Sequence, residues 1–174
     1  MSARLESPLP VRFACLMHDL GKGTTPADVL PRHLGHELRS AKLLKGVCQR
    51  LRVPTECREL ADVVAMEHGN IHRSGELNAA AVMRLIERCD GIRKPQRFEQ
   101  VLLACECDAR GRGGLQEQPY PQRPRLLTAL RAAQAVATAD IAALAASRGQ
   151  TGPKVGEAIH KARVQAVALA LTPP

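Results

Sequence analysis

The sequence predicts an all-α protein, a compact helical bundle followed by an Ala-rich helical tail. Apolar residues recur at helical spacing, and no segment shows the alternation of apolar and polar residues that is typical of a half-buried strand. The apolar mass is Ala, Leu and Val, while aromatic residues make up only 2% of the chain. Small aliphatic side chains favour closely packed helices over a β-sandwich. A chain of 174 residues is long enough for one domain with a substantial core.

Glycine and proline divide the chain into seven or eight expected helices. Gly21 is a natural end for the first helix, Pro54 is a natural start for the third, and Asn78 is a good N-cap for the fourth. The third helix is expected to end at Gly69, before a loop. The Gly- and Pro-rich residues 110–124 are not expected to hold regular structure. The expected helices span about 11–20, 36–51, 54–69, 79–89, 96–109, 125–137, 138–147 and 154–171.

Two of these helices have a clear apolar stripe, which predicts the face that each turns toward the core. The predicted inward residues are Leu38, Ala41, Leu44 or Lys45, and Cys48 in the helix over 36–51, and Phe98, Val101, Leu102 and Cys105 in the helix over 96–109.

The cysteine content and the distribution of apolar residues indicate the cellular compartment of the protein. The six cysteines contain no C-x-x-C pair and lie mostly in apolar helical stretches, which is typical of reduced, buried thiols in a cytosolic protein. No run of about 18 apolar residues predicts a membrane span, and the N-terminus lacks the apolar core of a signal peptide. The sequence therefore predicts a cytoplasmic protein that does not bind a membrane.

The net charge of +8 comes mainly from an excess of Arg, whose planar fork binds phosphate oxygens in pairs. A basic surface favours RNA or a phosphorylated small molecule as a partner, and a solvated basic face without a partner is the alternative. Three places are suited to phosphate contacts: a helix start at 93–97, the segment after 108, and the start of the last helix. The candidate RNA-binding residues are Arg93, Lys94, Arg97, Arg110, Arg112 and Lys154.

The most informative stretch is VRFACLMHDLGKG, residues 11–23, in which an apolar helix runs out at His18 and Asp19. An imidazole and a carboxylate at a helix end have no role in a hydrophobic core, but they can converge on one metal ion. A mixed nitrogen and oxygen site suits Mn, Fe, Ni, Zn or Mg. A His-Asp pair alone is a weak signal, because it occurs often by chance.

The other histidines strengthen the metal hypothesis. Five of the six histidines lie between positions 18 and 72, and each is at or near an expected helix end. For each one, a surface or hydrogen-bonded histidine is the simpler interpretation, but the set as a whole favours a site. The further candidates are His33, His36, His68, His72 and the carboxylate of Asp108.

The order and context of these residues resemble a known family. The motifs HDLGKG, PRHLGHE, RLRVP, EHGNIH, RKPQRFEQ and CDARGR follow one another from Val11 to Arg112, and GPKVGEAIHKAR follows near the end. They resemble the HD-domain metal-dependent phosphohydrolases and, within them, the C-terminal HD region of bacterial multifunctional CCA proteins. Those proteins are tRNA nucleotidyltransferases that add or repair the 3′-CCA end.

The resemblance implies a fold, an activity and roles for residues. It implies an HD domain over residues 1–112 and a helical tail over 113–174 that could bind tRNA. The implied activities are 2′,3′-cyclic phosphodiesterase, 2′-nucleotidase and phosphatase, with Mg, Mn or Ni as the divalent metal ion and tRNA, 2′,3′-cyclic nucleotides or other phosphoesters as partners. His18, Asp19 and Asp108 correspond to metal ligands.

The resemblance also implies catalytic roles. His36 and His68 correspond to ligands of a second ion, and in a site with one ion they would bind phosphate or move protons. Lys22, on the glycine-flanked turn, would neutralise phosphate charge. His33 and His72 are weaker candidates.

The sequence departs from the family pattern in the segment before His18. The pattern begins with a histidine before the His-Asp pair, and no histidine precedes His18. The D-x-D pair and G-S motif of a nucleotidyltransferase head are also missing. The sequence is thus expected to be part of a longer protein and to add no nucleotides alone. The alternative to a hydrolase is a non-catalytic helical scaffold that holds tRNA for a catalytic head elsewhere.

Overall fold

The computed structural model describes residues 1–172 and confirms the all-α prediction, since no strand occurs in this range. Within it there are eight α-helices and two short 3₁₀ turns. In chain order they are α1 (Leu9–Met17), η1 (Leu20–Thr24), α2 (His36–Arg50), α3 (Thr55–His72), η2 (Ser74–Glu76), α4 (Ala79–Arg88), α5 (Pro95–Arg110), α6 (Gln122–Gln134), α7 (Thr138–Ser147) and α8 (Pro153–Leu171).

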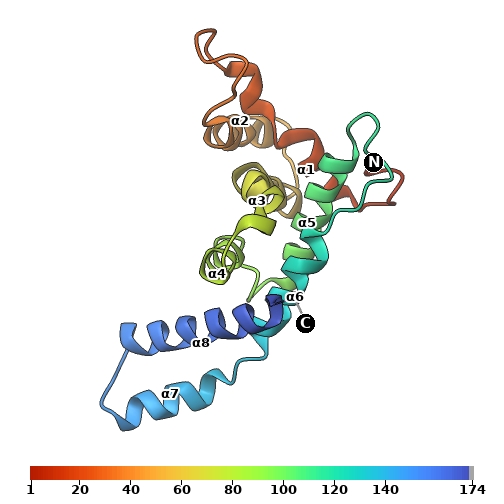
Figure 1. Cartoon of the computed structure of the whole chain (residues 1–174). Coiled ribbons are helices and arrows are strands. Elements are labelled where there is room, and N and C mark those ends of the chain that lie inside the picture. Colours follow the sequence, from red (N-terminus) through yellow and green to blue (C-terminus); the bar gives the residue numbers. More distant parts are fainter. Residues whose placement is uncertain (173–174) are drawn as a thin grey trace.

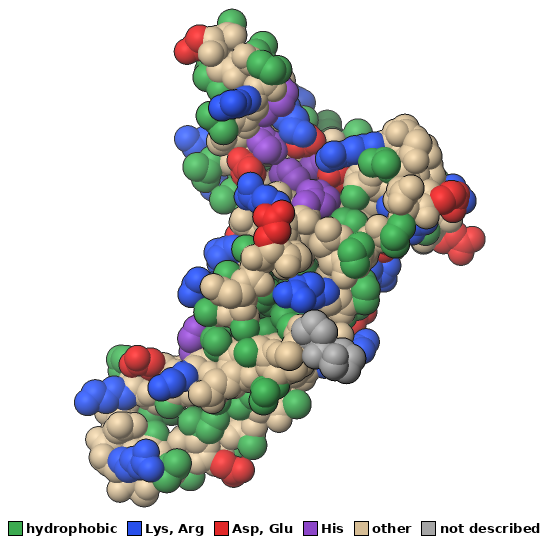
Figure 2. All heavy atoms as spheres, in the orientation of Figure 1, with side chains coloured by type: hydrophobic (Ala, Val, Ile, Leu, Met, Phe, Trp, Pro, Cys, Tyr) green, Lys and Arg blue, Asp and Glu red, His purple; other side chains and the backbone are tan. Residues whose placement is uncertain are grey.

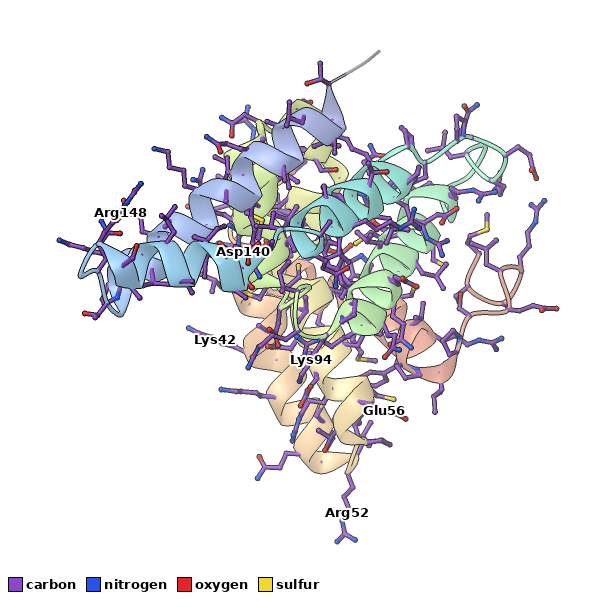
Figure 3. All side chains as sticks on the ribbon, turned by 90° about the horizontal axis from the view of Figure 1, so that it is seen from below. Lys42, Arg52, Glu56, Lys94, Asp140 and Arg148 are labelled. Carbon is purple, nitrogen blue, oxygen red and sulfur yellow. The ribbon has the colours of Figure 1, made fainter. Side chains whose placement is uncertain are left out.

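Helix α3 lies at the centre of the part of the molecule that carries the histidines, and α1, α2 and α5 pack against it (Figure 1). Lys94, just before α5, pairs with Glu59 near the start of α3, while Asp108 near the end of α5 contacts His72 at the end of α3. The two helices therefore run parallel, and their C-terminal ends meet. Farther down the molecule, α8 packs on α4 and α6, and α7 packs on α8. Figure 3 shows Arg148 projecting beyond the end of α7.

One continuous core links these helices. Phe98, Val101, Leu102 and Cys105 of α5 are fully buried, as the apolar stripe predicted. The same core includes Leu126 and Leu130 of α6 and Val167 of α8. The helices on both sides of residue 112 thus share a core, and the domain boundary at that residue stays a prediction.

Helix α1 begins and ends earlier than the predicted span of 11–20. Pro10 lies in its first turn, where proline costs no hydrogen bond, so the helix starts at Leu9. It ends at Met17, because Asp19 leaves the helical conformation with φ −105° and ψ 11°, and the chain tightens into η1. The His-Asp pair therefore lies in the link between two helical turns.

Three other predictions about helices were wrong. Residues 110–124 were not expected to hold regular structure, but α6 begins at Gln122, inside this range, and ends at Gln134 instead of residue 137. The predicted end of the third helix at Gly69 was wrong, because α3 continues to His72. Glycine costs a helix about 1 kcal/mol relative to alanine, and the fully buried Ile71 in the added turn offsets this cost. The inward assignment of Leu38 was also wrong, since it is 60% exposed. The buried face of α2 is made instead by Ser40, Leu44 and Cys48.

Asn78 caps α4 as predicted, because its side-chain oxygen accepts a hydrogen bond from the Ala81 N–H at 2.9 Å. Asn78→Ala removes this acceptor and is expected to lower the free energy of unfolding by about 1 kcal/mol. Urea unfolding followed by circular dichroism measures the change. Asn78→Ser retains a capping oxygen and should stay within a few tenths of a kcal/mol of the wild type. Equal stability of the Ala and Ser variants would contradict the assigned cap.

All six cysteines are free thiols, and five of them are buried, as the sequence predicted. No single helix within residues 1–172 is both long and apolar enough to cross a membrane. Helices α6 and α7 reach that length and apolar content only when they are taken together, and the chain bends by 43° between them.

Candidate metal centre

The predicted metal-binding and catalytic residues meet where the ends of α1, α3 and α5 approach the start of α2. His18 caps the end of α1, His36 opens α2, and the last turns of α3 and α5 carry the remaining groups. Figure 2 shows histidine atoms gathered in the upper half of the molecule, with acidic side chains among them. The residues brought together are His18, Asp19, His36, His68, His72 and Asp108.

The close approach of η1 to α2 depends on Gly21. The Gly21 N–H donates to Ser40 Oγ at 2.9 Å, and Arg39 Nε donates to the Gly21 carbonyl at 3.1 Å. A Cβ on Gly21 would lie 2.2 Å from the His36 carbonyl oxygen, so only glycine fits at this contact. The contact brings Asp19 Oδ1 within 3.3 Å of His36 Nε2.

Three imidazoles are fixed in the same way. In each, Nδ1 lies at hydrogen-bond distance from a backbone carbonyl: His18 at 2.9 Å from Cys15, His36 at 2.8 Å from His33, and His68 at 3.0 Å from Val64. A carbonyl can only accept, so each Nδ1–H is the donor. In the neutral ring this leaves a lone pair on Nε2, and the three Nε2 atoms face the carboxylates. Metal-binding histidines in general are oriented through their second nitrogen in this manner.

These nitrogen and oxygen acceptors lie close together. His36 Nε2 lies 3.2 Å from His68 Nε2, and Asp19 Oδ1 lies 3.7 Å from His68 Nε2. His18 Nε2 lies 3.3 Å from Asp19 Oδ2 and 3.6 Å from Asp108 Oδ1. Within the described residues, His18 Nε2 and Asp19 Oδ1 are buried and have no hydrogen-bond partner. Lone pairs that face one another in this way require a proton or a metal ion between them.

The electrostatics of the site point to the same requirement. Burial opposes a charged ring at His18, but the carboxylates of Asp108 and Asp19 outweigh it and raise the pKa of His18 to about 10. Burial also opposes ionisation of the two carboxyl groups, yet their neighbours, His18 above all, hold the pKa of both well below the usual range. Burial, and then the charge on His18, lower the pKa of His68, which favours its neutral, ligand form. Without a metal ion, a proton on His18 supplies the positive charge.

The residues present fit a divalent metal ion. One ligand atom each from His18, Asp19 and His68 lies within 4.8 Å of the others, and Asp108 Oδ1 lies beside His18. Imidazole nitrogen combined with carboxylate oxygen suits Mn, Ni, Zn or Fe, and the carboxylates alone would suit Mg. The donor set supports a divalent ion without selecting one metal.

Of three further candidates, two lie beside this centre and one does not. Lys22 Nζ donates to Asp19 Oδ2 at 2.6 Å, so the lysine adjoins the metal candidates. His72 Nε2 lies 2.9 Å from Asp108 Oδ2, which makes the weaker sequence candidate an immediate neighbour of the site. His33 does not reach it: its ring bonds to Thr25, and its carbonyl orients His36.

The candidate RNA-binding residues lie at three separate places along the chain. At the start of α5, Arg93 pairs with Asp90, and Lys94 pairs with Glu59. Arg97, on the first turn of α5, also pairs with Glu59 and with Asp90. Lys94 and Asp108 are separated by 14 positions, or about 21 Å along the helix. Their RNA-binding roles stay predictions.

The other three candidates lie elsewhere. Arg110 donates to Glu106 and to the Gln116 carbonyl, while Arg112 is exposed and lies 3.5 Å from Asp108. Lys154 lines a surface cavity at the start of α8. Their RNA-binding roles also stay predictions.

One neighbour of the site was missed from the sequence. Tyr120, on the segment between α5 and α6, has its hydroxyl 2.9 Å from His72 Nδ1. Burial raises the pKa of Tyr120, which keeps the phenol protonated. The available signal was a single tyrosine held between Pro119 and Pro121 after a Gly-rich loop.

Comparison with known proteins identifies the family of the chain. Residues 2–128 match the sequence model of the HD domain family. The chain is 74% identical over 167 residues to a protein of Polaromonas naphthalenivorans named "Multifunctional CCA protein", a match that covers 96% of this chain and 39% of that protein. Proteins of the same name from Acidovorax sp. and Ralstonia nicotianae are 71% and 57% identical, each over 97% of this chain.

The chain spans about two fifths of the length of these relatives, with 39% of the Polaromonas protein and 40% of the Acidovorax protein covered. No solved structure matches the chain.

Proposed function

Since this chain belongs to the HD domain family, we propose that its histidine and aspartate centre is a metal-dependent phosphohydrolase site that acts in tRNA 3′-end processing or repair. The proposed activities are 2′,3′-cyclic phosphodiesterase, 2′-nucleotidase and phosphatase. The observation that carries the proposal is the pair of buried, unpartnered atoms, His18 Nε2 and Asp19 Oδ1, facing further acceptors within the described residues. Such an arrangement is costly for a purely structural cluster, because a buried polar atom without a partner destabilises the fold.

The proposed metal ligands are His18, Asp19 and Asp108, joined by His68 on the evidence of its distance from Asp19. When bound, a divalent ion supplies positive charge that polarises a phosphoryl oxygen and lowers the pKa of a water molecule.

The surrounding residues have separate proposed roles. Lys22 and Arg112 bring positive charge to the two sides of the centre, beside Asp19 and Asp108, where they can bind phosphate oxygens. His36 Nε2 can hold or move a proton at the rim, because its Nδ1 is committed to the His33 carbonyl. In a centre with two ions, His36 and His68 would instead be ligands of the second ion.

The proposal of tRNA as a substrate rests on the names of the relatives and on the net charge of +8, which favours a polyanion. The six free cysteines are consistent with action in the reducing cytoplasm. A tRNA-binding scaffold without catalysis is the alternative. The buried, unpartnered acceptors speak against it, since a scaffold gains nothing from them.

Hydrolysis of 2′,3′-cyclic AMP tests the proposed function. After treatment with a chelator, the chain is expected to be inactive and to regain activity when Mg²⁺, Mn²⁺ or Ni²⁺ is added. His160→Ala is a suitable control, because His160 pairs with Glu87 on the surface, away from the site, and should leave the rate unchanged. If the chain hydrolyses neither 2′,3′-cyclic AMP nor a 2′-nucleotide with any of the three metals, the proposed activity is wrong. The tRNA-binding scaffold would then be the better account.

A further inference from the structure

A short chain of hydrogen bonds joins Asp108 to the segment before α6. Tyr120 Oη lies 2.9 Å from His72 Nδ1, and His72 Nε2 lies 2.9 Å from Asp108 Oδ2. The three residues come from different parts of the chain: the segment after α5, the end of α3 and the last turn of α5. The roles proposed above for the metal ligands, Lys22, Arg112 and His36 do not involve Tyr120.

The direction of these hydrogen bonds follows from the chemistry of the groups. Asp108 is ionised and can only accept, so His72 donates through Nε2–H. A neutral ring that is protonated on Nε2 has its lone pair on Nδ1, and the tyrosine hydroxyl donates to it. His72 is therefore held in the opposite tautomer from His68, whose Nδ1–H donates to a backbone carbonyl.

We propose that Tyr120 is a positioning residue of the metal centre: its hydroxyl fixes the tautomer of His72, and His72 then holds Asp108 Oδ2 so that Oδ1 faces His18. Asp108 Oδ1 lies 3.6 Å from His18 Nε2, on the side where the ion would bind. The inference rests on the metal-binding part of the proposed function and not on which phosphoester is hydrolysed.

The tyrosine is well placed for such a role because its segment is fixed at both ends. Before it, Arg110 Nη2 donates to the Gln116 carbonyl at 2.9 Å. After it, Gln122 Nε2 donates to the His72 carbonyl at 3.1 Å, which ties the start of α6 to the end of α3. The Tyr120 ring meets the His72 ring edge-on, with centroids 5.8 Å apart. Both the hydroxyl and the ring are thereby held against His72.

The alternative is that His72 binds the ion directly and Tyr120 only fills space. The two accounts differ in what the hydroxyl does. If Tyr120 only packs, Tyr120→Phe retains the ring and should leave the centre unchanged. If the hydroxyl sets the tautomer, Tyr120→Phe frees His72 to rotate or to move its proton to Nδ1, and Asp108 loses a fixed donor.

The first experiment uses the metal-free chain and does not depend on activity. Long-range ¹H–¹⁵N spectra of the histidine rings report which nitrogen carries the proton. We expect His72 to be protonated on Nε2 in the wild type and to lose this single form in Tyr120→Phe. A wild-type ring protonated on Nδ1, or an unchanged His72 signal in the variant, would overturn the proposal.

The second experiment is a double-mutant cycle on metal affinity, measured by isothermal titration of Ni²⁺. Tyr120→Phe is expected to weaken binding up to about 10-fold, the lower end of the range for a lost partner of a metal ligand, because Tyr120 acts on Asp108 only through His72. In a His72→Gln background the same change should weaken binding less than about threefold, because the intermediary is gone. Ser147→Ala, which removes an exposed hydroxyl on α7, serves as the control and should have no effect.

The outcomes separate this inference from the proposed function. An equal loss of affinity in both backgrounds, no loss in either, or no Ni²⁺ binding by the wild type would overturn the positioning role. Wild-type binding with the expected coupling but no hydrolysis of any phosphoester would support the positioning role and contradict the proposed activity.

Discussion

Replacing Asp19 with asparagine is expected to abolish metal-dependent hydrolysis and to weaken Mn²⁺ binding more than about 100-fold. Loss of a partner of a metal ligand already costs about 10–100-fold in affinity, and loss of a ligand costs more. Asp19 lies within 3.7 Å of His18, His36 and His68, so its carboxylate is shared by all three imidazoles. An amide of the same shape retains the packing but removes the negative charge.

Titration with Mn²⁺ and rates on 2′,3′-cyclic AMP measure these effects. Asp140→Asn is the matched control, because Asp140 is exposed on α7 (Figure 3) and should leave both quantities unchanged. Asp108→Asn should behave like Asp19→Asn. If Asp19→Asn bound Mn²⁺ as tightly as the wild type, Asp19 would not be a ligand and the proposed centre would be wrong.

Gly21→Ala is expected to disturb both the fold and the site. An added Cβ would lie 2.2 Å from the His36 carbonyl oxygen and 2.6 Å from the Ser40 backbone nitrogen, and neither backbone atom can move alone. Overpacking of this kind typically costs about 1–3 kcal/mol, and a clash with backbone favours the upper end. The movement of η1 away from α2 would also separate Asp19 from His36, so metal binding should weaken.

Gly23→Ala is a close control for this experiment. It adds the same methyl group two residues later, where no atom lies within 4 Å. Urea unfolding should show a loss of about 3 kcal/mol for Gly21→Ala and almost none for Gly23→Ala. Equal stability of the two variants would contradict the tight contact between η1 and α2.

Much of the fold could be predicted from the sequence because its helices are marked by local signals. Asn78 and Pro95 are effective starts for α4 and α5, and the stripe through Phe98 gave the correct buried face. The errors arose where tertiary packing outweighs a local preference. Gly69 signals an end, but α3 is held by neighbours on several sides and continues through it.

The composition of the site could also be predicted, but its geometry could not. The histidines and aspartates stand out at helix ends, and the structure brings His18, Asp19, His36, His68 and Asp108 together as expected. The backbone carbonyls that fix the three Nδ1 atoms carry no sequence signal, because every residue has a carbonyl. For that reason the tautomers could not be predicted.

Contacts between residues far apart in sequence account for the remaining differences. Tyr120 and His72 are 48 positions apart, and their hydrogen bond depends on how α6 meets α3. The candidate RNA-binding group at the start of α5 looked free in the sequence, yet Lys94 pairs with Glu59, 35 positions away. The sequence shows that Lys94 is charged, but it does not show which distant residue pairs with it.

The central claim is that a divalent ion binds among His18, Asp19, His68 and Asp108. Anomalous scattering from a crystal of the chain soaked with Mn²⁺ tests it most directly. We expect a strong peak about 2 Å from His18 Nε2 and from carboxylate oxygens of Asp19 and Asp108, the usual range for such ligands. A peak bound elsewhere on the chain, or a well-ordered centre without a peak at millimolar Mn²⁺, would contradict the account.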